Sequence, residues 1–353
     1  MKGIILHGGY GTRLRPLTYS RPKQLLPIAN IPMSQYGLSS LVKAGITDIA
    51  IIIGGENSNK VKDYYKNGED FGANITYVYQ DEPKGISHAI SLCKDFVGNE
   101  KFVVFLGDNV LAKEISDYVD DFKNSTDDAK ILLCEVSNPQ QFGVIEINSD
   151  GSIKKIVEKP KDPPTNLAVI GVYFLTKEFF EIMKILKPSA RGELEITDAL
   201  QLLLDSGKEI SYDKITNYWK DTGTTSDIID ANESIISQME PYFYGKKEEN
   251  VEIVQSVMVG KGTIIHPNSK IIGPVLIGND CIIGPNVKIG PNVSIGNNVK
   301  IENCEIDNSI IMNECLINSE IHLSQSIVPY RCNIEASGNT KLMLAEDSKL
   351  SLN

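Results

Sequence analysis

Three glycines and two cations near the start of the chain form the pattern with the clearest chemistry. Gly8, Gly9 and Gly11 follow a short apolar run, and Arg13 and Lys23 come shortly afterwards. Glycine lets a loop approach a ligand closely and aim several backbone N–H groups at phosphate oxygens. The two cations add positive charge that complements phosphate. The pattern therefore predicts a site for a small, highly charged anion such as a nucleoside triphosphate.

The distribution of charge along the chain supports this prediction. Residues 1–47 contain no Asp or Glu, although the 353-residue chain has a formal net charge of −11. Proteins that bind long nucleic acid usually present a broad basic face, so a nucleic-acid partner is not expected. The loop has neither the Gly-Lys-Ser/Thr of a Walker A motif nor the glycine spacing of the dinucleotide fingerprint. A plain glycine turn between a strand and a helix is the alternative interpretation.

Two aspartates stand where predicted strands end, and carboxylates at such places are candidate ligands of Mg²⁺. Asp108 follows the apolar run 102–106, and Asp221 follows Tyr218-Trp219-Lys220. Magnesium typically takes one or two protein carboxylates and completes its coordination with phosphate and water oxygens. Either aspartate could instead cap a helix or close a turn. This alternative has more weight for Asp221, because a Thr-Gly-Thr turn and a predicted helix at 226–238 follow it.

The elements that would position these residues alternate between strands and helices up to about residue 240. Apolar, β-rich runs predict strands, and the segments between them predict helices. We expect strands at 2–6, 49–53, 75–79 and 102–106, and helices at 33–44, 61–67 and 86–93. This alternation predicts an α/β domain with a mostly parallel sheet. Ligands of such sheets bind at the carboxyl ends of the strands, which is where the glycine loop and Asp108 stand.

Beyond residue 250 the hydrophobic pattern has a period of six. An aliphatic residue recurs at every sixth position from Val259 to Ile301, and a small or β-branched residue often follows four positions later. Hexapeptide repeats of this kind predict a parallel β-helix, in which aliphatic side chains stack from coil to coil. The spacing then loosens, which predicts less regular coils led by Ile306, Ile311, Leu316 and Ile321.

The chain is therefore expected to have a domain at 1–240, a linker at 241–250 and a β-helix at 251–353. The last stretch, 337–353, predicts either a terminal cap or a loose strand. No apolar stretch reaches the length of a membrane span and no signal-peptide pattern opens the chain, so a cytoplasmic protein without a membrane partner is expected. The six cysteines lack CxxC spacing and predict free thiols.

Taken together, the motifs resemble the sugar-phosphate nucleotidylyltransferases, most closely the longer glucose-1-phosphate thymidylyltransferases that carry a left-handed β-helix tail. The resemblance covers essentially the whole chain. It is carried by GGYGTRLRPLT from Gly8, PKQLLPI from Pro22, QDEPKG from Gln80, LGDNV around Asp108, FGV from Phe142, VEKP around Glu158, NLAV from Asn166, RGELEITD from Arg191 and YWKDTGT from Tyr218. Two positions depart from the family pattern, because His7 replaces the usual alanine and Phe142 replaces the tyrosine of the shorter enzymes.

The resemblance implies a Rossmann-like nucleotidyltransferase domain that makes dTDP-glucose and pyrophosphate from dTTP and glucose 1-phosphate, with Mg²⁺. Such a transfer needs alignment and charge neutralisation more than covalent help from the protein. A uridylyltransferase that uses UTP, or a bifunctional enzyme with sugar acetyltransferase activity in the β-helix, are the alternatives. We expect the β-helix to serve homo-oligomeric assembly or regulation. A chain ending near Gly245 is then expected to keep nucleotidyl transfer but lose oligomer size, thermal stability or both.

The residues implied for nucleotide binding offer backbone or side-chain groups to phosphates or base; they are Gly8, Gly9, Gly11, Thr12, Arg13, Lys23, Gln24, Gln80, Gly85 and Asp108. Arg13 would hold the β- and γ-phosphates, and Lys23 would neutralise charge near the α-phosphate. Gln24 and Gln80 would present a donor and an acceptor to the base edge. A buried glutamine in a turn is the alternative for each. Arg13, Lys23 and Asp108 form the implied catalytic set.

A second group of residues is implied for the sugar phosphate: Gly143, Glu158, Lys159, Val169 and Arg191. The Glu158 carboxylate would accept hydrogen bonds from sugar hydroxyls, while Lys159 and Arg191 would meet the phosphate. Backbone groups of the other two would contact the sugar. An exposed ion pair of little energetic value is the alternative for Glu158 and Lys159. Asp108 and Asp221 are the implied ligands of Mg²⁺.

Overall fold

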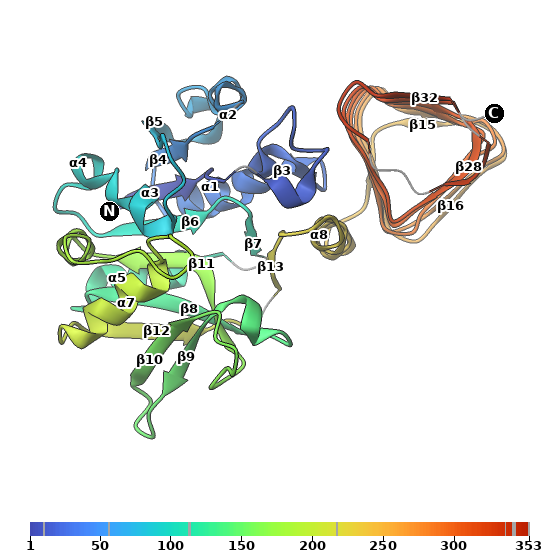
Figure 1. Ribbon diagram of the computed structural model, residues 1–353. Coiled ribbons are helices and arrows are strands. Elements are labelled where there is room, and N and C mark those ends of the chain that lie inside the picture. Colours follow the sequence, from blue (N-terminus) through green and yellow to red (C-terminus); the bar gives the residue numbers. More distant parts are fainter. Residues whose placement is uncertain are drawn as a thin grey trace. The chain divides into compact units, whose positions relative to one another are not determined.

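The computed structural model describes residues 1–9, 11–55, 57–111, 114–216, 218–335, 337–340 and 344–351, and its first part is built around a nine-stranded sheet (Figure 1). Strand β1 (Lys2–Leu6) lies between β4 (Asp48–Ile53) and β6 (Phe102–Leu106), and it is parallel to both. Strand β5 (Asn74–Tyr79) continues the parallel part beside β4. The four strands predicted from apolar runs are thus confirmed.

The other part of the sheet is organised by β11 (Leu167–Leu175), which is antiparallel to every strand that it pairs with. All nine residues of this strand are buried, and it pairs with β6 as well as with two strands that lie between β6 and β11 in the sequence. A strand covered on both faces is a continuous apolar run, which is what this segment is. The remaining strands are β8 (Ala129–Glu135), β9 (Gly143–Ile147), β10 (Ile153–Glu158) and β12 (Ile210–Lys214). The result is a Rossmann-like mixed sheet.

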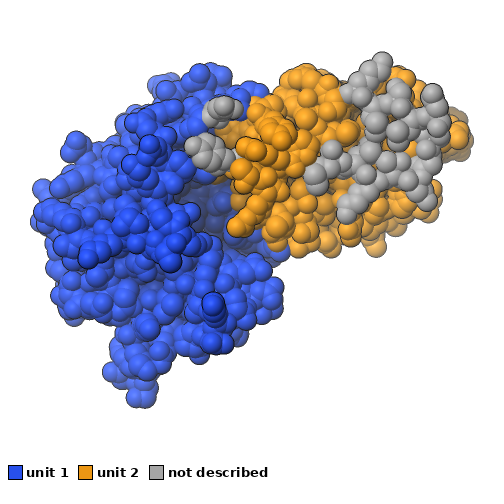
Figure 2. Space-filling view, in the orientation of Figure 1, with its two compact units in different colours: residues 1–10, 34–221 blue, residues 11–33, 222–353 orange. Residues whose placement is uncertain are grey.

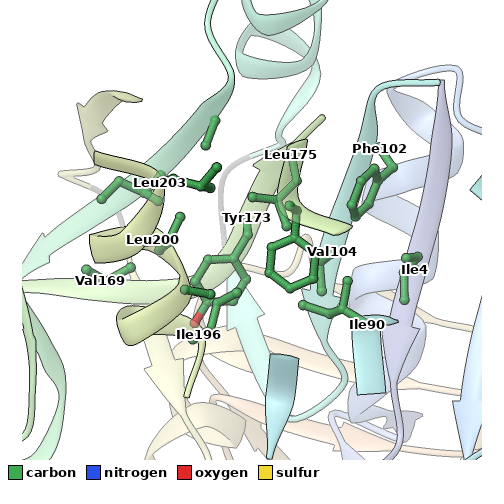
Figure 3. Packing of buried hydrophobic residues seen from close by; sticks show 14 of the residues in the cluster. Ile4, Ile90, Phe102, Val104, Val169, Tyr173, Leu175, Ile196, Leu200 and Leu203 are labelled. Atoms are coloured by element: carbon green, nitrogen blue, oxygen red, sulfur yellow. The ribbon is translucent and has the colours of Figure 1, made fainter. Parts of the chain in front are cut away.

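Helices connect these strands and bury apolar faces against them (Figure 3). Phe102 and Val104 of β6 and Tyr173 of β11 belong to the same buried cluster as Leu200 of helix α7. The helices are α1 (Met33–Lys43), α2 (Ser58–Tyr65), α3 (Ile86–Ser91), α4 (Lys94–Val97), α5 (Ser116–Asn124), α6 (Glu178–Ile182) and α7 (Ile196–Asp205). A single helix was predicted at 86–93. The observed helix α3 ends at Ser91, and a turn and the short helix α4 follow it. In the described part of the chain, no helix combines the length and apolar character that a bilayer crossing needs.

The second part of the chain is a left-handed parallel β-helix whose coils form a triangle when viewed along the axis (Figure 1). Each of its three sheets consists of strands that pair in parallel with the strand one coil later. The first sheet contains β14 (Tyr242–Phe243), β17 (Val257–Val259), β20 (Val275–Ile277), β23 (Val293–Ile295), β26 (Ile310–Ile311) and β29 (Ile327–Val328). The second contains β15 (Lys246–Lys247), β18 (Ile264–Ile265), β21 (Ile282–Ile283), β24 (Lys300–Glu302), β27 (Leu316–Asn318), β30 (Asn333–Glu335) and β32 (Lys349–Ser351). The third contains β16 (Val251–Val254), β19 (Ser269–Ile272), β22 (Lys288–Ile289), β25 (Glu305–Asp307), β28 (Glu320–Ser324) and β31 (Ser337–Thr340).

The aliphatic residues that lead the eight predicted repeats are all fully buried inside the β-helix, which confirms the hexapeptide pattern. Equivalent positions of the early coils are 18 residues apart, but those of later coils are 15 to 17 residues apart. Because of this shortening, Ile317 pairs with Ile301, and the neighbouring Leu316 points away from the fully buried core. The prediction that Leu316 leads a coil was therefore wrong by one residue. The prediction for Ile321 was wrong by two, because Leu323 is the residue that pairs with Ile306.

Short strands also occupy the segment that the sequence predicts as a linker. Within 241–250, β14 pairs with β17 and β15 pairs with β18, so this segment begins the β-helix. Two strands of two residues each leave no periodic pattern, and the charged run 246–249 masks them. At the other end, β31 and β32 form strands within 337–353, while residues 341–343, 352 and 353 lie outside the described residues.

Contacts divide the chain into two compact units (Figure 2). The first unit contains residues 1–10 and 34–221, and the second contains residues 11–33 and 222–353. This division differs from the boundary expected near 240, because residues 11–33 and helix α8 (Thr225–Ser237) pack with the β-helix. The glycine loop is consequently shared: Gly8 and Gly9 belong to the first unit, and the following cations belong to the second.

Candidate functional site

In the first unit, Gly8 and Gly9 follow β1 and line a small pocket. The pocket is lined by Gly8, Gly9, Gly54, Gly55, Gln80, Asp81 and Pro83. Gly9 has a φ of 92°, which only glycine adopts easily. A Cβ atom added to Gly8 would stand 3.3 Å from the side-chain oxygen of Gln80. The structure thus brings together three of the residues expected to bind nucleotide.

A histidine that sequence reasoning left without a role orients Gln80. The Gln80 side chain is buried, and its Nε2 lies 3.1 Å from Nδ1 of His88 in α3. Burial lowers the pKa of His88, and the nearby Lys84 charge acts in the same direction. The neutral ring can accept a hydrogen bond from the amide, which leaves the amide oxygen for another partner. Spacing alone, eight residues along the chain, gives no signal for this pair.

Gly85 precedes α3 in a conformation that a side chain could not share. Its φ is 103°, and an added Cβ would lie 2.6 Å from the backbone oxygen of Leu194. The amide of Leu194 donates to the carbonyl of Lys84 at 2.8 Å, and the Ser87 amide donates to the Leu194 carbonyl at 3.1 Å. Glycine here lets the segment before helix α7 pass close to the start of α3.

The two aspartates expected to bind a metal are brought to one pair of strands. Asp108 follows β6, and the short strand β7 (Asn109–Leu111) begins immediately after it. Strand β13 (Trp219–Asp221) runs antiparallel to β7, with Asp221 opposite Asn109. Helix α8 is capped by Thr224, whose side chain and that of Asp227 form a reciprocal capping box. Asp221 is therefore not the cap of that helix.

Asn109 fixes the surroundings of Asp108. This residue is only 3 % exposed. Its Nδ2 donates to Oδ1 of Asp108 at 3.1 Å, while its Oδ1 accepts from the Trp219 ring N–H at 2.7 Å and from the Gly171 amide at 3.2 Å. The sequence analysis gave Asn109 no role, although it is part of LGDNV. Its function as a link between three strands depends on pairings that the sequence does not reveal.

Three carboxylates act on a single buried phenol. Burial raises the pKa of Tyr173 far above its usual range, and the charges of Glu158, Asp108 and Asp221 raise it further. Since these effects fall off with distance, the three carboxylates lie around the same side chain. Of the three, Glu158 is paired with Arg191 and Lys159. In the described part of the chain no group of three or more His, Cys, Asp or Glu residues has a metal-binding arrangement. Asp108 and Asp221 are the pair that the sequence predicts as ligands of Mg²⁺.

His7, one of the two departures from the family pattern, is a buried neutral ring. Burial lowers its pKa to about 3, and the charge of Asp108 offsets this only in part. The ring packs edge-on against Tyr65, with 5.9 Å between ring centroids. Neither ring nitrogen has a hydrogen-bond partner among the described residues. At neutral pH His7 therefore adds no charge beside the glycine loop.

The residues expected to hold the sugar phosphate gather around Glu158. This residue ends β10 opposite Gly143, and its carboxylate accepts from Thr197 Oγ1 at 2.9 Å and from Arg191 Nη2 at 3.2 Å. The ammonium of Lys159 lies 3.7 Å from the same carboxylate. A Cβ on Gly143 would come within 2.4 Å of the Thr197 side chain, so this approach needs glycine. Thr197, in the first turn of α7, was missed by sequence reasoning.

Arg191 and Val169 each use part of their structure within the protein, which limits the groups that they can present to a ligand. The Arg191 guanidinium donates to Glu195 from Nε at 3.1 Å and from Nη2 at 2.8 Å, in addition to Glu158. It is 42 % exposed and so keeps a solvent-facing part. The side chain of Val169 is buried in the core cluster, which leaves its backbone for ligand contact.

In the second unit, two tight turns present the expected cations. Gly11, with a φ of 59°, precedes a 3-10 turn at Thr12–Leu14, and Thr18 Oγ1 donates to its carbonyl at 2.8 Å. A second 3-10 turn, Lys23–Leu25, begins near Gly11, since a Cβ there would lie 3.4 Å from the Cβ of Lys23. Arg13 is exposed and forms no ion pair with any described residue. Gln24 is buried.

The thiols and histidines of the tail have structural surroundings. All six cysteines are free, as expected, and five of them are buried. His266 lies 2.9 Å from Glu248, and His322 contacts Asp307. His322 also lines an open groove on the β-helix together with lysines, asparagines and glutamates.

Comparison with known proteins places these sites in context. The sequence profile of the family described as nucleotidyl transferase matches residues 2–238, and that of the GMPPB C-terminal domain matches residues 271–349. The chain is 37% identical to the low-salt glycan biosynthesis nucleotidyltransferase Agl11 of Haloferax volcanii, over 100% of both chains. It is 41% identical to a glucose-1-phosphate thymidylyltransferase of Streptomyces antibioticus, over 79% of this chain and 78% of the relative.

Solved structures agree with this likeness. A Bacillus anthracis chain assigned as glucose-1-phosphate thymidylyltransferase, in complex with sucrose, is 42% identical with a TM-score of 0.64, over 69% of this chain and 98% of that one. A UDP-glucose pyrophosphorylase complexed with UDP-glucose is 30% identical with a TM-score of 0.61, over 67% of this chain and 99% of that one. The similar proteins therefore differ in the nucleotide that their names imply.

Proposed function

This chain belongs to the nucleotidyl transferase family and is a nucleotidyltransferase of the sugar-1-phosphate type, and from this premise we propose that it makes dTDP-glucose and pyrophosphate from dTTP and glucose 1-phosphate. The observation that carries the proposal is that Asp221 of β13 lies opposite Asn109, the residue after Asp108, and that both aspartates and Glu158 act on the same phenol, that of Tyr173. The likeness to thymidylyltransferases supports the choice of nucleotide and sugar. We place the enzyme in the cytoplasm.

The proposed reaction is an in-line displacement at the α-phosphorus of the nucleotide. A phosphate oxygen of glucose 1-phosphate forms the new P–O bond, and the bond to the β-phosphate oxygen breaks, so that its electron pair leaves with pyrophosphate. Gly8, Gly9, Gly11 and Thr12 hold the phosphates through backbone N–H groups and a hydroxyl. The Arg13 guanidinium binds the β- and γ-phosphates and stabilises the leaving charge, while Lys23 neutralises charge near the α-phosphate.

Asp108 and Asp221 are the residues that would hold a divalent cation. Two carboxylates of this kind suit Mg²⁺, which takes its other ligands from phosphates and water. When bound, the ion would neutralise phosphate charge and orient the reacting groups. Asn109 keeps the Asp108 carboxylate in place by its hydrogen bond.

The sugar phosphate is assigned to the cluster around Glu158. With Thr197 and Arg191 holding one part of the carboxylate, its remaining lone pairs can accept hydrogen bonds from sugar hydroxyls. Lys159, exposed and only 3.7 Å from that carboxylate, supplies the charge for the phosphate. Arg191 contributes through its exposed part, and Gly143 and Val169 through their backbones.

Lys159→Ala is expected to weaken the binding of the sugar phosphate far more than the binding of the nucleotide. The reason is that a single ammonium meets the phosphate of one substrate only. We expect the KM for glucose 1-phosphate to rise by about tenfold to a hundredfold, with the KM for the nucleotide within about twofold. Steady-state kinetics with each substrate varied in turn measure this. Lys161→Ala, two residues away, serves as the control, and equal changes in both KM values for Lys159→Ala would contradict the assignment.

Base selection tests the choice of nucleotide. Gln24 and the His88-oriented Gln80 suit the imide edge of a pyrimidine and not the edge of adenine or guanine. We expect dTTP to be used best, UTP measurably, and ATP and GTP poorly, because one methyl group changes binding by only about 1–3 kcal/mol. A pyrophosphate-release assay over four nucleotides and several sugar 1-phosphates measures the order. A preference for GTP or ATP would show that the roles given to the two glutamines are wrong.

A specific observation keeps UTP as the second candidate substrate. A UDP-glucose pyrophosphorylase complexed with UDP-glucose is among the similar structures, and that ligand contains a uridine nucleotide. We propose that the β-helix serves homo-oligomeric assembly or regulation and not a second catalysis. Its His322 is held by the Asp307 carboxylate, and its outward lysines pair with glutamates, as Lys270 does with Glu252.

A further inference from the structure

Residues 11–33 carry Thr12, Arg13, Lys23 and Gln24, and they belong to the same compact unit as the β-helix (Figure 2). This segment contains two 3-10 turns and the hairpin of β2 (Pro27–Ile28) and β3 (Ile31–Pro32). It has little regular structure that could fix its shape by itself. The contacts that it makes with the β-helix and α8 therefore decide how its cations are presented.

The tip of the hairpin forms the first of these contacts. Ala29 and Asn30 both have positive φ, 48° and 63°. The Ala29 amide donates to Oδ1 of Asn232 in α8 at 2.9 Å, and Ser294 of the β-helix donates to the same oxygen at 2.7 Å. The Asn30 side chain donates to the carbonyl of Ile295 at 2.7 Å.

An apolar cluster surrounds these hydrogen bonds and excludes water from them. Ala29 is buried among residues of α8 and of the first coils of the β-helix. The cluster consists of Ala29, Ile236, Met258 and Leu276, with Ile235, Met239 and Tyr242 packed against it. In such surroundings the loss of a hydrogen bond costs more free energy than at a surface. The hairpin tip is therefore held in one position.

The second contact lies at Arg21, near the middle of the segment. Its guanidinium stands over the ring of Tyr330, 4.0 Å from the centroid. It also donates to Oε1 of Glu346 at 3.1 Å, and the Glu346 side chain is only 4 % exposed. Arg331, within the β-helix, binds the same oxygen at 2.5 Å. Arg21 thus joins segment 11–33 to the last coil, while Arg331 makes a comparable bond that does not involve the segment.

We propose that Arg21 and Asn30 are positioning residues for the nucleotide, through which the β-helix holds Lys23 and Gln24 in their binding arrangement. The proposal rests on the proposed function of this segment. Arg21 precedes Lys23 by two residues and Asn30 follows Gln24 by six, and backbone hydrogen bonds hold the chain between them. The Leu25 amide donates to the Pro22 carbonyl at 3.0 Å, and the Leu26 amide donates to the Lys23 carbonyl at 2.9 Å. A displacement at either end is therefore passed to Lys23.

Arg21→Gln and Asn30→Gly in the full-length chain test the proposal. Glycine keeps the positive φ and removes only the side-chain hydrogen bond. Each substitution is expected to raise the KM and the directly measured Kd for dTTP by about tenfold, with the KM for glucose 1-phosphate within about twofold. Arg21→Lys keeps the charge but not the planar stacking on Tyr330, so it is expected to restore part of the affinity. Titration calorimetry of dTTP and steady-state kinetics give these values.

Arg331→Gln is the matched control, because it removes a bond to the same Glu346 oxygen without touching segment 11–33. We expect its dTTP affinity to stay within about twofold of that of the unsubstituted protein. The positioning role would be overturned if both test variants bound dTTP with the affinity of the unsubstituted protein. It would also be overturned if Arg331→Gln lowered the dTTP affinity as much as the test variants do. If the unsubstituted protein bound no nucleoside triphosphate, the proposed function itself would fall, and that result is distinct from the other two. Thermal unfolding of all variants shows whether lost affinity merely follows lost stability, which would also count against the proposal.

Discussion

Turnover is expected to fall by about two to three orders of magnitude when either Asp108 or Asp221 is replaced by Asn, while the fold is kept. Each substitution removes one negative charge from the group around Tyr173 but preserves the size and the polar contacts of the side chain. An amide oxygen binds Mg²⁺ more weakly than a carboxylate does. Initial rates at saturating dTTP and glucose 1-phosphate, measured over a range of Mg²⁺ concentrations, check the result.

Two further measurements make this prediction specific. Raising the Mg²⁺ concentration should recover part of the activity of the variants, since the loss lies in metal affinity. Asp227→Asn is the control, because Asp227 belongs to the capping box of α8 and has no proposed part in the reaction. Near-normal turnover of Asp221→Asn would return Asp221 to a structural role in the turn before that helix.

Arg13→Ala is expected to lower kcat/KM by at least about a hundredfold. Arg13 is exposed, lies in a tight turn after Gly11, and forms no ion pair with any described residue, so its charge is not neutralised within the protein. Its proposed partners, the β- and γ-phosphates, gain charge as pyrophosphate leaves, and the guanidinium matches them in geometry. Arg13→Lys should recover only part of the rate, because an ammonium lacks the planar pair of donors.

Arg15→Ala supplies a close control for that experiment. Arg15 is also exposed and stands two residues away, but its guanidinium lies over the ring of Tyr19, 5.1 Å from the centroid. Its loss is expected to change kcat/KM by less than about threefold. If the two alanine variants behaved alike, the effect would come from general charge and not from a phosphate contact of Arg13. Pyrophosphate release, followed with each variant under the same conditions, separates these cases.

Features set by local sequence were predictable. The strands from Lys2, Ile49, Ile75 and Phe102 are apolar runs whose burial follows from composition, and the period of six reveals the β-helix directly. Asp108 could be selected because a carboxylate after such a run requires a partner. In each of these cases a few neighbouring residues contain the whole signal.

Features that depend on pairing between distant segments were not predictable. Asn109 contacts Gly171 and Trp219, and Thr197 reaches Glu158, only after the sheet and α7 have formed. The contact of Asn30 with Ile295 joins positions that are 265 residues apart. The shortened coils moved the predicted leading residue from Leu316 to Ile317, because a fixed period cannot anticipate a change in coil length.

The packing of segment 11–33 on the β-helix has a consequence for the synthesis of the protein. The segment is made before the residues that it contacts in the β-helix. These are Tyr330 and Glu346, which Arg21 contacts directly, and Ser294, which shares the side-chain oxygen of Asn232 with Ala29. At typical rates the intervening residues take roughly 15 to 60 seconds to be added. During that time segment 11–33 lacks its contacts with the later coils, although β1, which precedes it, can already pair with β4. The contacts of this segment with Ser294, Tyr330 and Glu346 can therefore form only after those residues have been made. A chain ending near Gly245 would lack all of them, so the sequence-based expectation that it keeps full nucleotidyl transfer disagrees with the proposed positioning role of the β-helix.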